Sequence, residues 1–267
     1  MKYELRKGES LEKEEFWLLA IDQLKSKFRQ CLLIAEAYWG KEKELLDMGF
    51  DYTYDKALYD LMMKGDIEQL KTHLSMPDVE HQKMVRFLEN HDEPRAMDVF
   101  GHDRIRCAMI IHSTLPGARF WQHGQFEGNR IKLPVQLKRA PEEVADHDLK
   151  TFSEKLLREV NHPVFHYGLW EMCPTFGWED NHSHRNLLTW CWTMGEEKRL
   201  LVNNFSTSPA QGYVNLPSSW TNQRENVILM DPLKEEKFLQ SPVVLKEKGL
   251  YVGLESGDFH FFRIEKG

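Results

Sequence analysis

The sequence contains few cysteines and no cysteine motif. Its four cysteines, Cys31, Cys107, Cys173 and Cys191, are scattered along 267 residues, and none forms a C-x-x-C pair. This spacing argues against a zinc knuckle and against a redox dithiol. Cys31 and Cys107 lie in apolar runs, where a buried free thiol is expected. Cysteine use this sparse indicates a reducing compartment.

Long apolar runs and an excess of positive charge are also missing. No stretch approaches the roughly 18 apolar residues that a membrane-spanning helix requires, and residues 1–15 show no signal-peptide pattern. We therefore expect a soluble cytoplasmic protein with no membrane partner. The formal net charge is −7, from 35 basic and 42 acidic residues, which argues against a nucleic-acid partner.

Aromatic residues and histidines, by contrast, are abundant. The chain has eight tryptophans, 15 phenylalanines and 12 histidines, and aromatic residues make up 12% of it. Flat rings stack on the apolar faces of sugars, and imidazoles bond to hydroxyl groups. The composition therefore suits a carbohydrate ligand, with packing in the core as the alternative for each single ring.

Two kinds of pattern follow one another along the chain. Up to about residue 164, short apolar segments that end in polar residues alternate with helical patterns, which predicts a parallel sheet with crossover helices. From residue 165 onward, short β-branched and aromatic segments between turn residues predict an antiparallel β-sandwich. We therefore predict an α/β domain over 1–164 and a β domain over 165–267. Helices are expected at 10–29, capped by Ser10, and at 54–63, 66–74 (capped by Asp66), 103–112 and 142–161.

Three predicted strands end in polar residues. In α/β barrels the active site lies at the C-terminal ends of the strands. Two carboxylates placed there suit glycoside cleavage, in which one carboxylic acid protonates the leaving oxygen and the other carboxylate attacks the anomeric carbon or directs water at it. A helix cap or a surface charge is the alternative for either carboxylate alone. The strands are Cys31–Ala35, expected to be buried on both faces and followed by Glu36, Tyr38 and Trp39; Lys83–Asp92, ending in Asn90, His91 and Asp92; and Ala118–Gln125, ending in Gln122, His123 and Gln125.

The same segments match motifs of one known family. CLLIAEAYW (31–39), FLENHDEPR (87–95) and LPGARFWQHGQ (115–125) resemble the fifth-, seventh- and eighth-strand motifs of the alpha-amylase family, glycoside hydrolase family thirteen. MGFDYTYDKALYDLM (48–62), LPVQLKRAPEE (133–143) and GLYVGLESGDFHFFRI (249–264) are similar to further stretches of it. The resemblance implies the C-terminal half of a (β/α)8 TIM barrel, strands five to eight, followed by an antiparallel all-β domain.

The resemblance also implies a role for each motif residue. Glu36 would be the general acid/base, Asp92 the carboxylate that stabilises the transition state, and His91 a ligand of sugar hydroxyls. Tyr38, Trp39 and Gln125 are expected substrate contacts, with packing at the barrel rim as the alternative for Trp39. No cofactor and no metal site is predicted: the calcium site of the family lies beside the third strand, and His182 and His184 are expected in a solvated loop.

The nucleophile motif of the family is missing. In the family this residue is an Asp in a G-x-R-x-D motif on the fourth strand, and neither that motif nor the third-strand D-x-x-x-N-H motif is present. We expect the chain to begin just past the nucleophile and to be inactive alone. Because four strands cannot close an eight-stranded barrel, it should act on alpha-glucans with an N-terminal half of the barrel or self-associate. The alternatives are a non-catalytic amylase-like scaffold and a carbohydrate-binding protein.

Overall fold

The computed structural model of the protein describes residues 16–222 and 225–267, without the side chains of residues 78, 79 and 266. The chain divides into two compact units, residues 1–54 and 55–267. The predicted cap Ser10 lies outside the described residues. Among the helices that are described, none combines the length and the apolar character that crossing a bilayer demands.

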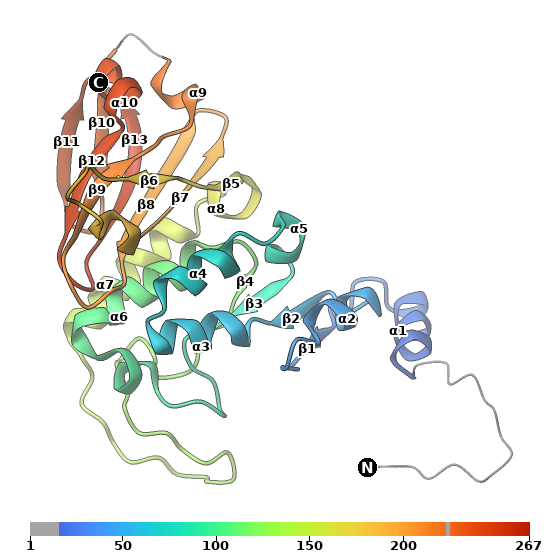
Figure 1. Cartoon of the computed structure of the whole chain (residues 1–267). Helices are drawn as coiled ribbons and strands as arrows, with labels where there is room; N and C mark the ends of the chain where they lie inside the picture. The colour runs from blue at the N-terminus through green and yellow to red at the C-terminus, as the bar shows by residue number, and fades with distance from the viewer. Residues whose placement is uncertain (1–15, 223–224) are drawn as a thin grey trace, which may run out of the picture. The chain divides into compact units, whose positions relative to one another are not determined.

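The first unit is a small α/β element, drawn in blue in Figure 1. Its core is formed by Ile21, Ala35 and Phe50. The strand predicted at Cys31–Ala35 is corrected to two paired residues, and Ile34 is exposed rather than buried because the core of this unit covers only one face of the strand. The elements are α1 (Phe16–Lys27), β1 (Ile34–Ala35), α2 (Glu42–Asp47) and β2 (Tyr52–Tyr54), with β1 and β2 parallel.

The second unit begins with three helices, α3 (Lys56–Lys64), α4 (Ile67–Leu74) and α5 (Asp78–His81). Asp55 caps α3 by accepting a hydrogen bond from the backbone N–H of Leu58 at 3.0 Å. Asp66 caps α4 in the same way through Gln69, also at 3.0 Å, so this predicted N-cap is confirmed. The caps satisfy backbone donors that a helix leaves free in its first turn.

A pair of parallel strands follows, β3 (Met84–Arg86) and β4 (Ala118–Arg119), with Val85 opposite Ala118. Both are shorter than the predicted segments, because the residues beyond them turn away from the ladder. Between them lies α6 (Ala96–Thr114), which Gly101 interrupts with a φ of 63°. Helix α7 (His147–Val160) ends before His162-Pro163, as predicted, and α8 (Val164–Tyr167) follows.

The remainder forms two antiparallel sheets, as the sequence predicts. One has the strand order β11-β10-β13-β8-β7-β5 and the other the order β12-β9-β6. The sequence did not single out β5, β6 or β11. The elements are β5 (Leu169–Met172), β6 (Thr175–Phe176), the 3-10 helix η1 (Ser183–Asn186), β7 (Leu187–Met194), β8 (Glu197–Asn204), β9 (Ala210–Val214), α9 (Ser218–Thr221), β10 (Val227–Asp231), β11 (Glu236–Gln240), α10 (Pro242–Lys248), β12 (Leu250–Leu254) and β13 (Phe259–Lys266).

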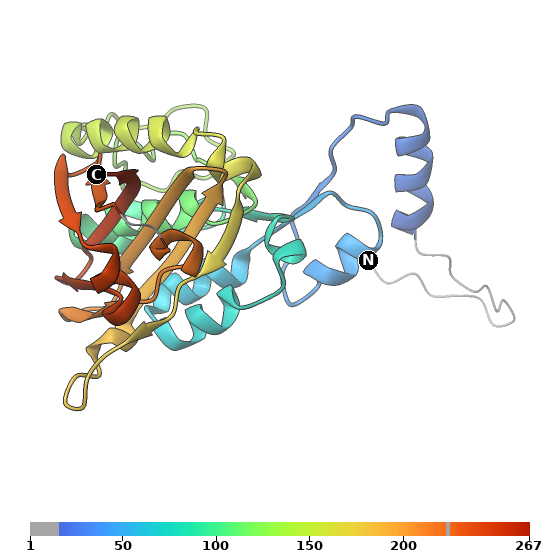
Figure 2. The same cartoon turned by 90° about the horizontal axis from the view of Figure 1, so that it is seen from above.

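One hydrophobic core joins the helices and the six-stranded sheet of the second unit. Helix α6 packs against α7 and against β8 and β13 (Figure 2). The indoles of Trp190 and Trp192 on β7 donate hydrogen bonds to the hydroxyl and carbonyl oxygens of Thr114, at 3.2 and 2.7 Å. The packing surrounds these polar contacts with apolar side chains. The predicted domain boundary at 164/165 stays a prediction.

Candidate functional site

His91 and Asp92 form an exposed turn beyond β3. The buried residues Phe87 and Leu88 continue the chain past the strand, and the polar residues of the turn follow them. His91 Nε2 lies 3.4 Å from Asp92 Oδ1, and the Asp92 side chain is 62% exposed. The carboxylate is therefore open to a ligand, and the neighbouring imidazole offers a second hydrogen-bonding group.

The side chain of Asn90 stabilises this turn. Its Oδ1 accepts hydrogen bonds from the backbone N–H groups of Asp92 and Glu93, both at 2.9 Å. An acceptor that bonds the backbone two residues ahead forms an Asx turn and fixes its geometry. The Nδ2 group of Asn90 is buried and has no partner among the described residues. Because buried donors are nearly always bonded, such a group suits a ligand.

Glu89 and Arg95 tie the turn to its surroundings. The buried carboxylate of Glu89 accepts a hydrogen bond from the backbone N–H of Ala96 at 2.5 Å, at the start of α6. Arg95 Nη2 lies 2.9 Å from Glu89 Oε1 and donates to the carbonyl of His123 at 2.9 Å. Burial raises the pKa of Glu89 to about 7, although the Ala96 N–H and Arg95 act to lower it. One arginine thus links the His91–Asp92 turn to the loop after β4.

Gln125 lies in that loop and is buried. Its Oε1 accepts a hydrogen bond from the backbone N–H of Gln122 at 3.3 Å, whereas its Nε2 has no partner among the described residues. Gly124 has a φ of 83°, and a Cβ there would lie 2.9 Å from Arg95 Nη2. Only glycine therefore allows this close approach. A substrate contact of Gln125 through Nε2 stays a prediction.

The connection between β4 and α7 contacts the turn at a second point. Lys132 donates a hydrogen bond from Nζ to the backbone carbonyl of Asp92. Near Lys132 in the sequence, Arg130 lines a pocket of about 410 Å³ together with His102 and Glu143. The pocket combines cationic and anionic groups, whereas the turn itself offers a single carboxylate.

Beneath the turn, β3 carries a buried charge. Arg86 donates from Nη1 to Asp55 Oδ2 at 3.0 Å and from Nε to the carbonyl of Pro116 at 2.8 Å. Its Nη2 lies 2.7 Å from His81 Nδ1. Burial lowers the pKa of His81 to about 4, so the neutral ring accepts from Arg86 and donates from Nε2 to the carbonyl of Leu74. Every charged group here has a partner, which marks a structural network.

Asp55 is the anion of this network. Burial acts to raise the pKa of Asp55, but the charge of Arg86 and the contacts of His73 lower it overall. His73 Nε2 lies 2.9 Å from Asp55 Oδ1. The ionised carboxylate is therefore held between two donors while it also caps α3.

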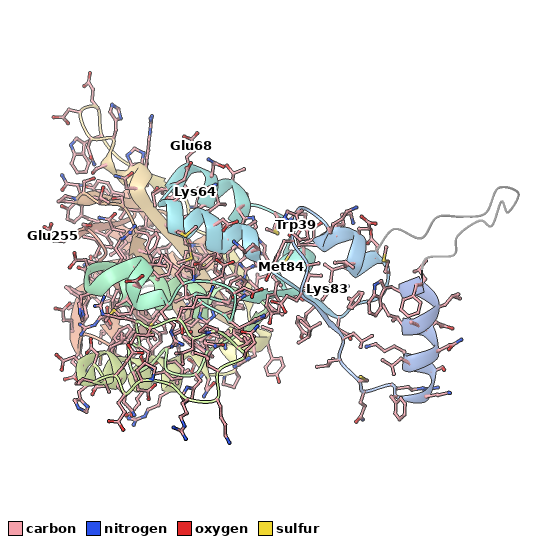
Figure 3. All side chains as sticks on the ribbon, turned by 90° about the horizontal axis from the view of Figure 1, so that it is seen from below. Trp39, Lys64, Glu68, Lys83, Met84 and Glu255 are labelled. Carbon is pink, nitrogen blue, oxygen red and sulfur yellow. The ribbon has the colours of Figure 1, made fainter. Side chains whose placement is uncertain are left out.

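Glu36 lies at the end of β1, in the first unit. It is exposed, and its Oε1 accepts a hydrogen bond from the Tyr38 hydroxyl at 3.1 Å. Trp39, labelled in Figure 3, follows with a φ of 67° and is 89% exposed. A bulky residue in the left-handed region stores strain, and such residues cluster at functional sites. The ring of Trp39 meets that of Tyr38 edge to face at 5.8 Å.

The predicted site residues thus form two local groups. Glu36, Tyr38 and Trp39 lie together in the first unit, and the His91–Asp92 turn lies in the second with Gln125 in a loop tied to it. The union of these two groups in a single cleft stays a prediction. His182 and His184, which were not predicted to bind a metal, lie at η1, where His184 Nδ1 is 3.2 Å from the carbonyl oxygen of Asn181.

Sequence reasoning did not assign roles to Glu89, Asn90 or Arg95. The signal for Glu89 was present, since a carboxylate directly after the apolar pair Phe87 and Leu88 is buried only when it is paired. The pairing with Arg95 follows from the turn between them, which brings residues at the two ends of FLENHDEPR side by side. No pattern indicated that Asn90 would leave one donor unpaired.

Short parallel strands with crossover helices, followed by two antiparallel sheets, define a mixed α/β protein. No protein-family model matches the sequence. A curated relative, the alpha-amylase MalA of Haloarcula japonica, is 31% identical over 124 residues, which are 43% of this chain and 18% of that protein.

Solved structures of alpha-amylases share the fold. A maltogenic alpha-amylase of Thermotoga neapolitana superposes with a TM-score of 0.73 at 17% identity, over 93% of this chain and 57% of that one. The alpha-amylase of Geobacillus thermoleovorans in complex with acarbose gives a TM-score of 0.70 at 17% identity, over 94% and 57%. The chain therefore spans little more than half the length of these structures. The resemblance to the alpha-amylase family is confirmed, and the fold is that of these enzymes.

Proposed function

We propose that the chain is the C-terminal part of a retaining alpha-glucan hydrolase or transferase and supplies strands five to eight of its barrel. The observation that carries the proposal is the His91–Asp92 turn, an exposed carboxylate and imidazole at the end of β3. The turn is braced by Asn90, Glu89 and Arg95. A surface charge that served only solubility would need no such bracing, which supports a binding or catalytic role.

Each group has a defined task in this proposal. Glu36 protonates the leaving oxygen and then takes a proton from the water or the acceptor hydroxyl that attacks the glycosyl–enzyme bond. Asp92 stabilises positive charge that develops on the sugar ring, because its carboxylate is held close to the reacting centre. His91 and the free Nδ2 of Asn90 bind sugar hydroxyls, and the rings of Tyr38 and Trp39 stack on the sugar.

The attacking carboxylate belongs outside these 267 residues in the proposal. The sequence contains no G-x-R-x-D motif, and a retaining mechanism requires a carboxylate within roughly 5–5.5 Å of the acid. An N-terminal half of the barrel would supply this carboxylate and cover the free edges of the short parallel strands. The isolated chain is then inactive but still presents part of the sugar site.

Two measurements on the isolated chain test the proposal. Calorimetric titration with acarbose should show binding that Asp92→Asn abolishes, while Asp98→Asn, at an exposed aspartate on the neighbouring helix α6, leaves it intact. Release of the aryl group from a maltosyl aryl glycoside should not exceed the uncatalysed rate. Loss of acarbose binding in both variants alike would contradict the assigned site, and turnover by the isolated chain would contradict the missing nucleophile.

A further inference from the structure

The three-stranded sheet carries a row of aromatic side chains on its outer face. The register of its strands places Phe176 of β6 opposite Tyr213 of β9, and Tyr213 opposite Tyr251 of β12. The ring centroids are 5.4 Å apart in the first pair and 5.7 Å in the second. Trp178, just after β6, meets Tyr213 edge to face at 6.2 Å. These four residues are called the aromatic face below.

The aromatic face is open to solvent although its strands have a buried side. Alternate residues of β9 and β12, among them Val214 and Val252, face inward and belong to the core of the sandwich. On the outer side Tyr251 is 53% exposed and Trp178 41%. Large rings exposed together in one row mark a binding surface more often than rings scattered singly.

The three strands that carry the rings are uncharged, although the exposed residues Glu179 and Asp180 follow Trp178 in its loop. None of the residues in β6, β9 and β12 carries a charge, whereas charged residues make up 29% of the chain. The Tyr251 hydroxyl donates to Gln211 Oε1 at 2.8 Å, beside the rings. Gly253 lies opposite Gln211 and has no side chain, so no bulky group stands beside the rings at this position. By contrast, the exposed edge strand β11 begins with Glu236 and Lys237.

The loop that carries Trp178 is held in place before any ligand arrives. Asn181 donates from its backbone N–H to the carbonyl of Trp178 and from Nδ2 to the carbonyl of Gln211, both at 2.9 Å. The backbone N–H of Gln211 donates to the Ser183 hydroxyl at 3.0 Å. A Cβ on Gly177 would lie 2.3 Å from the carbonyl oxygen of Asn181, so this tight loop requires glycine there. Such preorganisation lowers the entropic cost of binding.

We propose that the aromatic face is a second carbohydrate-binding site, which takes a chain of uncharged sugars apart from the site at Glu36 and Asp92. Rings contact the apolar faces of the sugars, and Gln211 with the tyrosine hydroxyls bonds to sugar hydroxyls. Strands without charged side chains suit an uncharged polyol better than an acidic or basic partner. The choice of an alpha-glucan among neutral glycans rests on the proposed function.

Native electrophoresis of the intact chain through gels that contain soluble starch tests the proposal. The wild type should be retarded, and the double variant Phe176→Ala/Tyr251→Ala should raise the apparent dissociation constant by about tenfold or more. Tyr167→Ala removes another exposed tyrosine, on α8, and should migrate like the wild type. Gly253→Thr places a side chain beside Gln211, where its Cβ would lie 3.4 Å from the Tyr251 hydroxyl and 3.9 Å from the Gln211 Cβ, both ordinary contacts, and should weaken retardation without unfolding the sheet.

Further outcomes separate this proposal from the proposed function. Asp92→Asn should still be retarded by starch, because the aromatic face is intact in this variant. If Asp92→Asn abolishes retardation and the double variant keeps it, the aromatic face is not a binding site and the proposed function stands. Retardation by hydroxyethylcellulose but not by starch overturns the alpha-glucan assignment. A wild type that is a dimer in light scattering, with a monomeric double variant and unchanged starch retardation, makes the face a protein interface and refutes the proposal.

Discussion

Arg86 and Asp92 lie close together in one segment, yet they represent two opposite uses of charge. Arg86 is buried on β3, and its guanidinium contacts Asp55, His81 and the carbonyl of Pro116. Asp92 is exposed at the end of the same segment, and its carboxylate lies 3.4 Å from His91 Nε2. The buried charge has all the partners it needs within the protein, whereas the exposed carboxylate has room for another molecule.

The difference shows that one part of the segment stabilises the fold and another part is free to bind a ligand. A buried charge without partners would cost several kcal/mol, so the lower part of the segment is a network that stabilises the fold. The upper part, from Asn90 on, has a buried donor without a partner in the described part of the chain and an exposed carboxylate. Substitutions along the segment should therefore change from effects on stability to effects on sugar binding.

The largest effect on stability is expected for Arg86→Met. The variant leaves the buried carboxylate of Asp55 without the guanidinium, so the free energy of unfolding should fall by roughly 3–5 kcal/mol. Urea denaturation followed by circular dichroism measures this value. Arg139→Met, at an exposed arginine in the loop after β4, should change it by less than about 0.5 kcal/mol. Equally small effects of both variants would contradict the structural role assigned to Arg86.

The next effect depends on pH and concerns His112. Burial lowers the pKa of this histidine from 6.5 to about 3, and its Nε2 donates to the carbonyl of Arg86 at 2.9 Å. As the pH falls below 6.5 the unfolded chain takes up the proton first, so stability present above that pH is lost toward pH 3. Between pH 7 and pH 4 the wild type should lose about 3 kcal/mol more than His112→Gln.

Measuring the difference between wild type and variant is necessary because Glu89 acts in the opposite direction. Its pKa is raised from 4.5 to about 7 by burial, so the folded protein keeps a proton that the unfolded chain releases between these values. Its contribution to stability therefore declines as the pH rises. Parallel unfolding curves of wild type and His112→Gln at both pH values would show that His112 is not buried in its neutral form.

A smaller effect is expected for Asn90, which lies between the buried network and the exposed turn. Asn90→Ala removes the acceptor of the Asp92 and Glu93 N–H groups, and the free energy of unfolding should fall by about 1 kcal/mol. Binding of acarbose should weaken as well, because the turn is no longer fixed. Asn90→Ser keeps an acceptor of the same turn type and should recover part of both losses. A serine variant that is as weak as the alanine variant would contradict the role of the turn.

The smallest effect on stability is expected for Asp92→Asn. The side chain is exposed, so the free energy of unfolding should change by less than about 0.5 kcal/mol. Acarbose binding should nevertheless be lost, whereas the effect expected for Arg86→Met is a loss of stability. The same titration and urea experiments measure both quantities. A strong loss of stability at Asp92 would show that its carboxylate is structural.

The sequence predicted the polar ends of the strands but not their lengths or their support. FLENHDEPR pointed to His91 and Asp92 through the change from apolar to polar residues. The paired part of β3 is only Met84–Arg86, because strand length depends on partners that lie elsewhere in the chain. Arg86 received no role from the sequence, and its partners Asp55, His81 and Pro116 lie in other segments of the chain. No local pattern could reveal them.

The β domain shows the same limit. Its antiparallel strands were predicted from β-branched and aromatic segments, and they are present. Strand β11 was missed because EKFLQ is charged and exposed at an edge of the sheet. The aromatic face could not be predicted from the sequence either, because Phe176, Tyr213 and Tyr251 become neighbours only through the register of three strands.

Carbon-13 NMR of the side-chain carboxyl groups tests the central proposal most directly, that Glu36 and the His91–Asp92 turn share one sugar site. During a titration of the intact chain with acarbose, the carboxyl signals of Glu36 and Asp92 should shift together along curves that give one dissociation constant. The signal of Asp98 should stay in place. A shift of Asp92 without Glu36, or two different constants, would contradict the proposal.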